Sequence, residues 1–281
     1  MQRFYTSNGL KSMASSASAR AHFALIAILL AWLCTTCCLG QDNPPRFLQG
    51  GVEHSQQLEP VQSQLRVGGK FDQAKLDKIA PRRTWFKVPP WLAGKWQYDE
   101  YTQTFYEDYR GKDGRTYRKP AQGSETWASQ RDRSGGLWRF FMVPTLTQVS
   151  TDRELFEDMH NYDSVISDSD AQVVLRSLTT RTVVDKATNT VSQVKQVEQF
   201  ISFFPYSADM VRAEFSIKSF DYRGQPIDLT KGWKIGRRVA PFMLNNFDQN
   251  NQDVRPSFRE FLVSNGMENL VPLEEPSTIY P

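Results

Sequence analysis

Alternation of apolar and polar residues with a period of two dominates the chain from Trp91 onward. In residues 211–218 every odd position is apolar and every even position is polar, the pattern of a half-buried strand. Similar runs, rich in Thr, Val and aromatic residues, are separated by turn sequences such as GKDG (111–114), RSGG (133–136) and KATN (186–189). The pattern predicts a mainly β fold, an antiparallel meander of roughly eight to ten strands closing into a barrel.

Two short helices are expected beside the strands. Thr151 and Glu154 have the spacing of a capping box, followed by apolar Leu155, Phe156 and Met159 on one helical face. Near the end of the chain, Pro256 and Gly266 mark the start and stop of a second helix.

The first 40 residues have the pattern of a signal peptide. They contain Arg3, Lys11 and Arg20 but no acidic residue, and an unbroken apolar run extends from Phe23 to Leu33. Cleavage after Gly40 would export the rest of the chain to the periplasm, the cell envelope or the medium. Two alternatives are an uncleaved membrane anchor and lipid attachment at Cys37 or Cys38.

The remaining chain divides into a linker and one domain. All three cysteines lie between residues 34 and 38, so a mature chain would have no disulfide or cysteine-based site. Residues 41–80 begin with a segment rich in Gln, Pro, Gly and Ser, which predicts a flexible linker, and a short helix is expected over 70–81. Residues 81–281 are then expected to form a single β-barrel domain.

Charge argues against nucleic-acid binding. The formal net charge of +3 is carried by the leader, which leaves 31 of the 34 basic residues against 31 acidic ones. A neutral mature chain lacks the broad positive field that nucleic-acid binding normally requires. Contact with a membrane is therefore expected only through the leader, if it is retained or lipidated.

Gly94-Lys95-Trp96, at the entry to the first long strand, resembles the Gly-x-Trp pattern of lipocalins and the wider calycin group. The resemblance implies a lipocalin-like barrel in which Trp96 plugs the closed end and an arginine near the last strand, Arg237 or Arg238, stacks on its indole. The chain lacks the disulfide cysteines usual in that family. The alternative is that Trp96 is an ordinary core residue of an unrelated β domain.

Aromatic side chains on the predicted strands are the candidates to line a ligand cavity, because such walls are typical of small-molecule sites. With the plug residues, the predicted ligand-binding set is Trp96, Tyr98, Phe105, Trp127, Trp138, Phe215, Arg237 and Arg238.

Signals for catalysis or metal binding are weak. Seven carboxylates between Asp152 and Asp170 do not match a calcium-binding loop, so a solvated loop and helix face is expected there. His160 is the one histidine in the predicted folded domain, which excludes multi-histidine zinc sites. Glu198 and Glu214, on neighbouring predicted strands, are the best candidates for a pair of carboxylates that could hydrolyse a glycosidic bond. Their alternation with apolar residues, however, predicts that both side chains point outward into solvent.

No catalytic residue, metal or cofactor is therefore predicted. The favoured function is an exported, non-enzymatic barrel that binds a small apolar or amphipathic ligand. One alternative is a cell-envelope structural protein with a filled barrel and a protein partner. Another is a lyase or isomerase that uses the barrel pocket, with His160 or an acid as base.

Overall fold

The computed structural model describes residues 53–72, 81–109, 111, 117–248 and 250–273. The predicted leader (1–40), the linker up to residue 52 and most of the predicted helix at 70–81 lie outside the described residues. The strands are β1 (Arg82–Val88), β2 (Gly94–Asp108), β3 (Tyr117–Trp127), β4 (Gln130–Arg131), β5 (Leu137–Val143), β6 (Thr145–Ser150), β7 (Glu154–Asp168), β8 (Val173–Asp185), β9 (Thr190–Ser207), β10 (Met210–Phe220) and β11 (Pro226–Ala240). The helices are α3 (Arg255–Ser264) and the short 3₁₀ turns η1 (Ser63–Leu65) and η2 (Glu268–Leu270).

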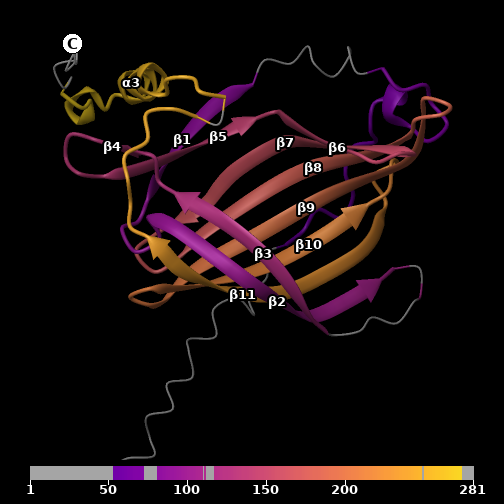
Figure 1. The fold of residues 1–281 in the computed structure, drawn as a ribbon, viewed down its shortest axis with the longest axis horizontal. Coiled ribbons are helices and arrows are strands. Elements are labelled where there is room, and N and C mark those ends of the chain that lie inside the picture. Colours follow the sequence, from indigo (N-terminus) through magenta and orange to yellow (C-terminus); the bar gives the residue numbers. More distant parts are fainter. Residues whose placement is uncertain (1–52, 73–80, 110, 112–116, 249, 274–281) are drawn as a thin grey trace, which may run out of the picture. The chain divides into compact units, whose positions relative to one another are not determined.

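Eight strands form one antiparallel sheet in the order β3-β2-β11-β10-β9-β8-β7-β6 (Figure 1). Consecutive strands from β6 to β11 pair in sequence, so the predicted meander is confirmed. The sheet curls strongly at one end. The rings of Trp127 on β3 and Phe203 on β9 lie 4.6 Å apart, although four strand spacings, about 19 Å in a flat sheet, separate their strands. The face that carries these two side chains is therefore concave.

Closure into a complete barrel is the part of the expectation that the structure corrects. The edge strands β3 and β6 do not pair with each other, so the sheet is an open half-barrel. A second, three-stranded sheet in the order β1-β5-β4 packs on the concave side. Apolar side chains of this small sheet, such as Phe86 and Phe141, pack against the concave core, which buries one end of the larger sheet without ladder hydrogen bonds.

Both faces of the small sheet are buried. Successive residues of a strand point to opposite sides, so neighbouring residues of β5 pack against different parts of the protein. Leu137 and Phe141 of β5 pack toward the half-barrel, whereas Trp138 and Phe140 pack against the helix α3 with Phe258. The predicted helix between Pro256 and Gly266 is confirmed, because α3 covers most of that range and Gly266 follows it with a φ of 71°.

The prediction of a helix near residues 151–159 is wrong, because the strand β7 runs through most of this range. Thr151 Oγ1 does accept a hydrogen bond from the Glu154 backbone N–H (3.0 Å), as in a helix cap, but here that bond closes a turn. From Glu154 onward β7 pairs with β8, which sets Leu155 opposite Val184 and Phe156 opposite Val183. Pairing along the whole strand outweighs a weak local helical preference. The acidic stretch 152–170 is correspondingly mostly strand, and its carboxylates range from the buried Glu157 to the exposed Asp168 and Asp170.

Residues 53–72, which we call the outer segment, pack on the main sheet instead of forming a free linker. Val61, Leu65 and Phe71 are buried against Val191 and Val194 of β9. Backbone hydrogen bonds from Leu58 to Gly224 and from Val61 to Tyr222 fix the path of the segment.

The outer segment also buries Glu198, which was expected to point into solvent. The Glu198 side chain does point to the convex side of the sheet, whereas Phe203 of the same strand points to the concave side. The Glu198 side chain is nevertheless 0% exposed. It accepts hydrogen bonds from Ser55 N (2.8 Å), Ser55 Oγ (2.9 Å) and Arg176 (2.6 Å) and contacts His54 Nδ1 (3.0 Å). No local pattern indicates this cover, because the covering residues His54 and Ser55 lie more than 140 residues away from Glu198 along the chain.

Candidate functional site

The closed end of the half-barrel is built around Trp96. Its indole is fully buried and donates a hydrogen bond to the Leu92 carbonyl (2.7 Å). The guanidinium of Arg238 covers the ring at 4.4 Å from the ring centroid and donates to the carbonyls of Ala93 and Trp91. The indole and the arginine thus seal this end of the concave face.

Tyr98 lies next on the same concave face. Lys234 Nζ sits 3.8 Å from the centre of its ring and also forms an ion pair with Glu125 (2.8 Å). The Tyr98 hydroxyl is buried and has no hydrogen-bond partner among the described residues. Burial raises the pKa of Tyr98, and the nearby Glu125 carboxylate raises it further, so the hydroxyl keeps its proton.

Arg139 enters the same region from β5 of the small sheet. Its guanidinium lies 4.2 Å from the centre of the Trp127 ring, and its Nη1 is buried without a hydrogen-bond partner among the described residues. Burial lowers the pKa of Arg139, while the charges of Glu125 and Asp163 oppose that shift. A buried guanidinium with an unused donor is costly unless an acceptor reaches it.

Asp163, on β7, belongs to the same group of charges. Burial raises the pKa of its carboxyl to about 6, although His160 and Arg139 act in the opposite direction. His160 Nδ1 in turn lies 3.1 Å from Thr179 Oγ1. The interior end of the half-barrel thus combines a buried guanidinium, a phenol without a hydrogen-bond partner among the described residues and a carboxyl whose pKa is raised to about 6.

Beyond these polar groups the concave face is only partly covered. Leu175, Ile201 and Ile217 are half-buried there, and the ring of Phe215 stands edge-on to Tyr101 at 5.9 Å. Gly232 lets Phe215 lie flat on the sheet, since a Cβ at that glycine would come within 2.5 Å of the ring. An apolar lining therefore runs away from Arg139 and Tyr98 along the open part of the sheet.

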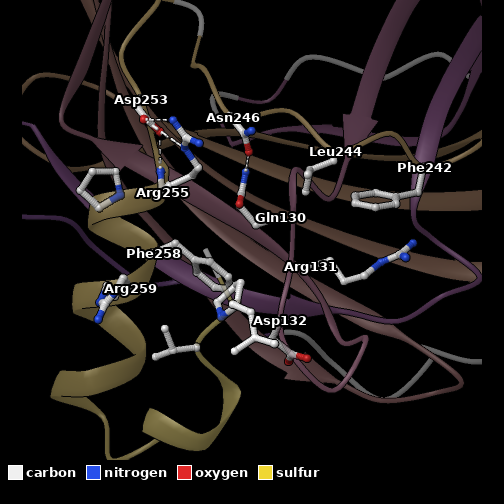
Figure 2. A pocket seen from close by; sticks show the side chains of 14 residues that line it. Gln130, Arg131, Asp132, Phe242, Leu244, Asn246, Asp253, Arg255, Phe258 and Arg259 are labelled. Carbon is white, nitrogen blue, oxygen red and sulfur yellow. Dashed lines mark hydrogen bonds and ion pairs between the residues drawn. The ribbon is translucent and has the colours of Figure 1, made fainter. Parts of the chain in front are cut away.

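A separate groove of about 1000 Å³ lies outside the half-barrel, between α3 and β4 (Figure 2). Phe258 forms part of its floor, with Arg131 on the β4 side and Arg255 and Arg259 on the helix. Gln130 donates hydrogen bonds to the carbonyl of Asn245 (2.7 Å) and to Asn246 Oδ1 (3.2 Å), which fixes the segment that forms the upper wall.

The predicted ligand-binding residues do not form one set. Trp96, Tyr98, Trp127 and Arg238 come together at the closed end, and Phe215 lines the open part of the same face. Three others lie elsewhere: Trp138 packs under α3, while Phe105 and Arg237 are exposed on the convex side. The stacking expected for Arg237 or Arg238 is made by Arg238, because the register of β11 places it opposite Trp96 and turns Arg237 to the other face.

Sequence reasoning missed Arg139 and the whole groove. The available signal for Arg139 was its position between Trp138 and Phe140, where a charge interrupts an apolar run, but nothing in the sequence showed that both faces of β5 are covered. The groove joins residues 130–132 to residues 242–273, and its walls meet only in the folded chain.

Neither a metal site nor a membrane-spanning helix emerges from the described residues. Within them, no group of three or more His, Cys, Asp or Glu side chains is placed to hold a metal ion. The helices described there are too short or too polar to cross a membrane.

Comparison with protein-family models, with curated proteins and with solved structures yields no match for this chain.

Proposed function

We propose that the protein binds a small amphipathic ligand on the concave face of the half-barrel. The observation that carries the proposal is a pair of buried donors, Arg139 Nη1 and Tyr98 Oη, that find no hydrogen-bond partner in the part of the chain that the structure describes and lie at the inner end of an apolar lining. A ligand with an acceptor group at one end would satisfy both donors. Its apolar body would cover Phe215, Ile201 and their neighbours.

The geometry favours binding over catalysis. Trp96 and Arg238 fix the closed end, and the Arg139 guanidinium is positioned over the Trp127 ring. Preformed donors of this kind orient a ligand at little entropic cost. Export of the protein is part of the proposal and rests only on the pattern of residues 1–40.

A fluorescent long-chain fatty acid and the corresponding fatty alcohol are suitable probes. We expect the acid to bind more tightly than the alcohol, because its carboxylate can accept from Arg139. The Arg139→Gln variant should weaken binding of the acid by about 10-fold or more, the usual size of a lost charged hydrogen bond, and Tyr98→Phe by about 5-fold.

Arg237→Gln is the matched control, since it removes an arginine from the exposed convex side. Equal affinity in all three variants, or no binding of either probe by folded protein, would reject the proposal. Tyr98→Phe removes only the hydroxyl, so it remains informative if Arg139→Gln fails to fold.

A further inference from the structure

We propose that Ser216 and His54 are the nucleophile and the general base of an ester-hydrolysing site on the convex side of the main sheet, with Glu198 as the positioning residue of His54. Ser216 and Glu198 come from the neighbouring strands β10 and β9, and His54 comes from the outer segment that covers them. Because this site lies on the opposite face of the sheet from the concave lining, it does not depend on the ligand-binding function proposed above.

The three side chains have the hydrogen-bond order of the groups that activate the serine in serine hydrolases. Ser216 Oγ lies 2.8 Å from His54 Nε2, and His54 Nδ1 lies 3.0 Å from Glu198 Oε2. Both distances are within hydrogen-bond reach, as a nucleophile, its base and the group that orients the base require. His54 is separated from each of the other two by more than 140 residues along the chain, so only the fold brings the three together.

The carboxylate of Glu198 fixes which nitrogen of His54 carries the proton. Burial alone would raise the pKa of Glu198, but hydrogen bonds from His54, Ser55 and Arg176 lower it to about 2, so the group is ionised at neutral pH. An ionised carboxylate can only accept, so His54 Nδ1 must donate to it. In the neutral imidazole, Nε2 then accepts from the Ser216 hydroxyl, which is the arrangement of a general base.

The imidazole is held firmly in this orientation. The His54 side chain is 7% exposed, and its ring stands edge-on to Phe200 at 5.0 Å. The next residue, Ser55, is fixed at both backbone groups, because its N–H donates to Glu198 (2.8 Å) and its carbonyl accepts from Lys218 Nζ (2.8 Å). Such preorganisation keeps a base in the productive geometry.

A cation lies beside Ser216 on the side away from His54. Lys231 of β11 is directly opposite Ser216 in the register of β10 and β11, and its side chain is exposed. Side chains of directly opposite residues share one face of a sheet, with their Cβ atoms about 5 Å apart. The ammonium can therefore reach the carbonyl oxygen of an ester bound at Ser216, where a positive charge would stabilise the oxyanion of the transition state.

The surface around Lys231 favours an apolar substrate. The Phe105 ring lies 5.7 Å from the Lys231 ammonium and is 42% exposed. Trp233 is half-buried and follows two residues after Lys231, on the same face of the strand. These rings offer a contact for the acyl chain of a small uncharged ester, which is the substrate class that we infer.

The reaction consumes one ester and one water. Ser216 Oγ attacks the carbonyl carbon while His54 Nε2 takes the hydroxyl proton. The C–O bond to the alcohol breaks as His54 returns that proton to the leaving oxygen, and the acyl group stays on Ser216. A water molecule then attacks the acyl carbon and gives its proton to His54, which passes it to Ser216 Oγ as the carboxylic acid leaves.

The first test is covalent labelling of the purified protein with a fluorescent fluorophosphonate, which transfers its phosphonyl group to an activated serine as fluoride leaves. We expect one label per molecule, located on Ser216 by peptide mass spectrometry, and no label on Ser216→Ala. Ser167→Ala, which removes an exposed serine of β7, is the matched control and should be labelled like the wild type. Absence of a label, or a label on another residue, would overturn the proposal.

The second test is the hydrolysis of p-nitrophenyl butyrate. Ser216→Ala and His54→Gln should each lower kcat/KM by about 100-fold or more, and Lys231→Gln should lower kcat by about 10-fold. Ser216→Ala removes only a hydroxyl at a half-buried position, so it decides the test if His54→Gln fails to fold. Ser216→Ala turnover equal to that of the wild type would overturn the proposal.

The role of Glu198 is tested by turnover per active site. Glu198→Gln at pH 7 should lower kcat for each site that the fluorophosphonate finally labels by about 10-fold or more, with KM changed by less than about 2-fold. A purely structural role would reduce the number of labelled sites but leave the kcat of each one unchanged, and that result would overturn the assignment of Glu198. Fatty-acid binding should persist in Ser216→Ala, because the concave face is untouched.

Discussion

Arg238 closes the half-barrel over Trp96: its guanidinium stacks on the indole at 4.4 Å and donates to two carbonyls of the turn that leads into β2. One side chain thus joins β11, the last strand along the chain, to the entry of β2. The stack places a cation on a fully buried aromatic ring, and the hydrogen bonds satisfy carbonyls that the turn leaves unpaired.

Arg238→Lys should destabilise the fold by about 1–3 kcal/mol, because an ammonium cannot reach both carbonyls and stack at the same time. Chemical denaturation monitored by tryptophan fluorescence measures the effect. Arg237→Lys, one residue earlier but exposed, serves as the control and should change stability by less than about 0.5 kcal/mol. Equal effects of the two substitutions would show that the stack contributes nothing.

Gly94 is required by the same turn. Its φ is +129°, and a Cβ there would lie 2.7 Å from the Ala240 carbonyl oxygen. Gly94→Ala should therefore cost about 2 kcal/mol or more, combining backbone strain with a clash against β11. Gly123→Ala, in β3, meets no atom within 4 Å and is the comparison. A Gly94→Ala protein with unchanged thermal stability would contradict this account of the turn.

Glu198 should make stability depend on acidic pH. Burial alone would raise its pKa, but hydrogen bonds from His54, Ser55 and Arg176 lower it from 4.5 to about 2. Since the folded-state pKa is the lower one, the ionised carboxylate stabilises the fold above pH 4.5, and this contribution is lost as the pH falls toward 2.

Glu198→Gln should lose about 3 kcal/mol at pH 7 and show a flatter stability profile between pH 4.5 and 2. Urea denaturation across that range measures both. Glu214→Gln, on the neighbouring strand and partly exposed, should retain the wild-type profile. A Glu198→Gln profile as steep as that of the wild type would assign the acid sensitivity to other carboxyls.

Asp163 should have the opposite effect on how the stability of the fold depends on pH. Its pKa is raised from 3.8 to about 6, so the folded state binds the proton more tightly and loses stability as the pH rises from 4 to 6. Asp163→Asn should therefore stabilise the protein by about 1–2 kcal/mol at pH 7.5 and have little effect below pH 4. Asp170→Asn, at an exposed position, provides the control. Destabilisation of Asp163→Asn at pH 7.5 would mean that the ionised carboxylate has a favourable partner in the fold.

The sequence by itself determined most strands of the meander, the helix near Pro256 and the buried position of Trp96 at the entry to β2. These features follow from local periodicity and from residues with a fixed conformational role, so they need no knowledge of distant contacts. The capping-box signal at Thr151 misled for the same reason, because it reported a local hydrogen bond that a strand could also use.

Only the tertiary structure decided that the sheet stays open, that residues 53–72 cover its convex side and that Glu198 is buried beneath them. It also decided which groups meet at the candidate sites: Arg139 with Tyr98 inside the half-barrel, and Arg131 with α3 across the groove. Alternation shows that a strand has two faces but not what covers each of them. That cover comes from segments far away along the chain, whose packing is set by the whole fold.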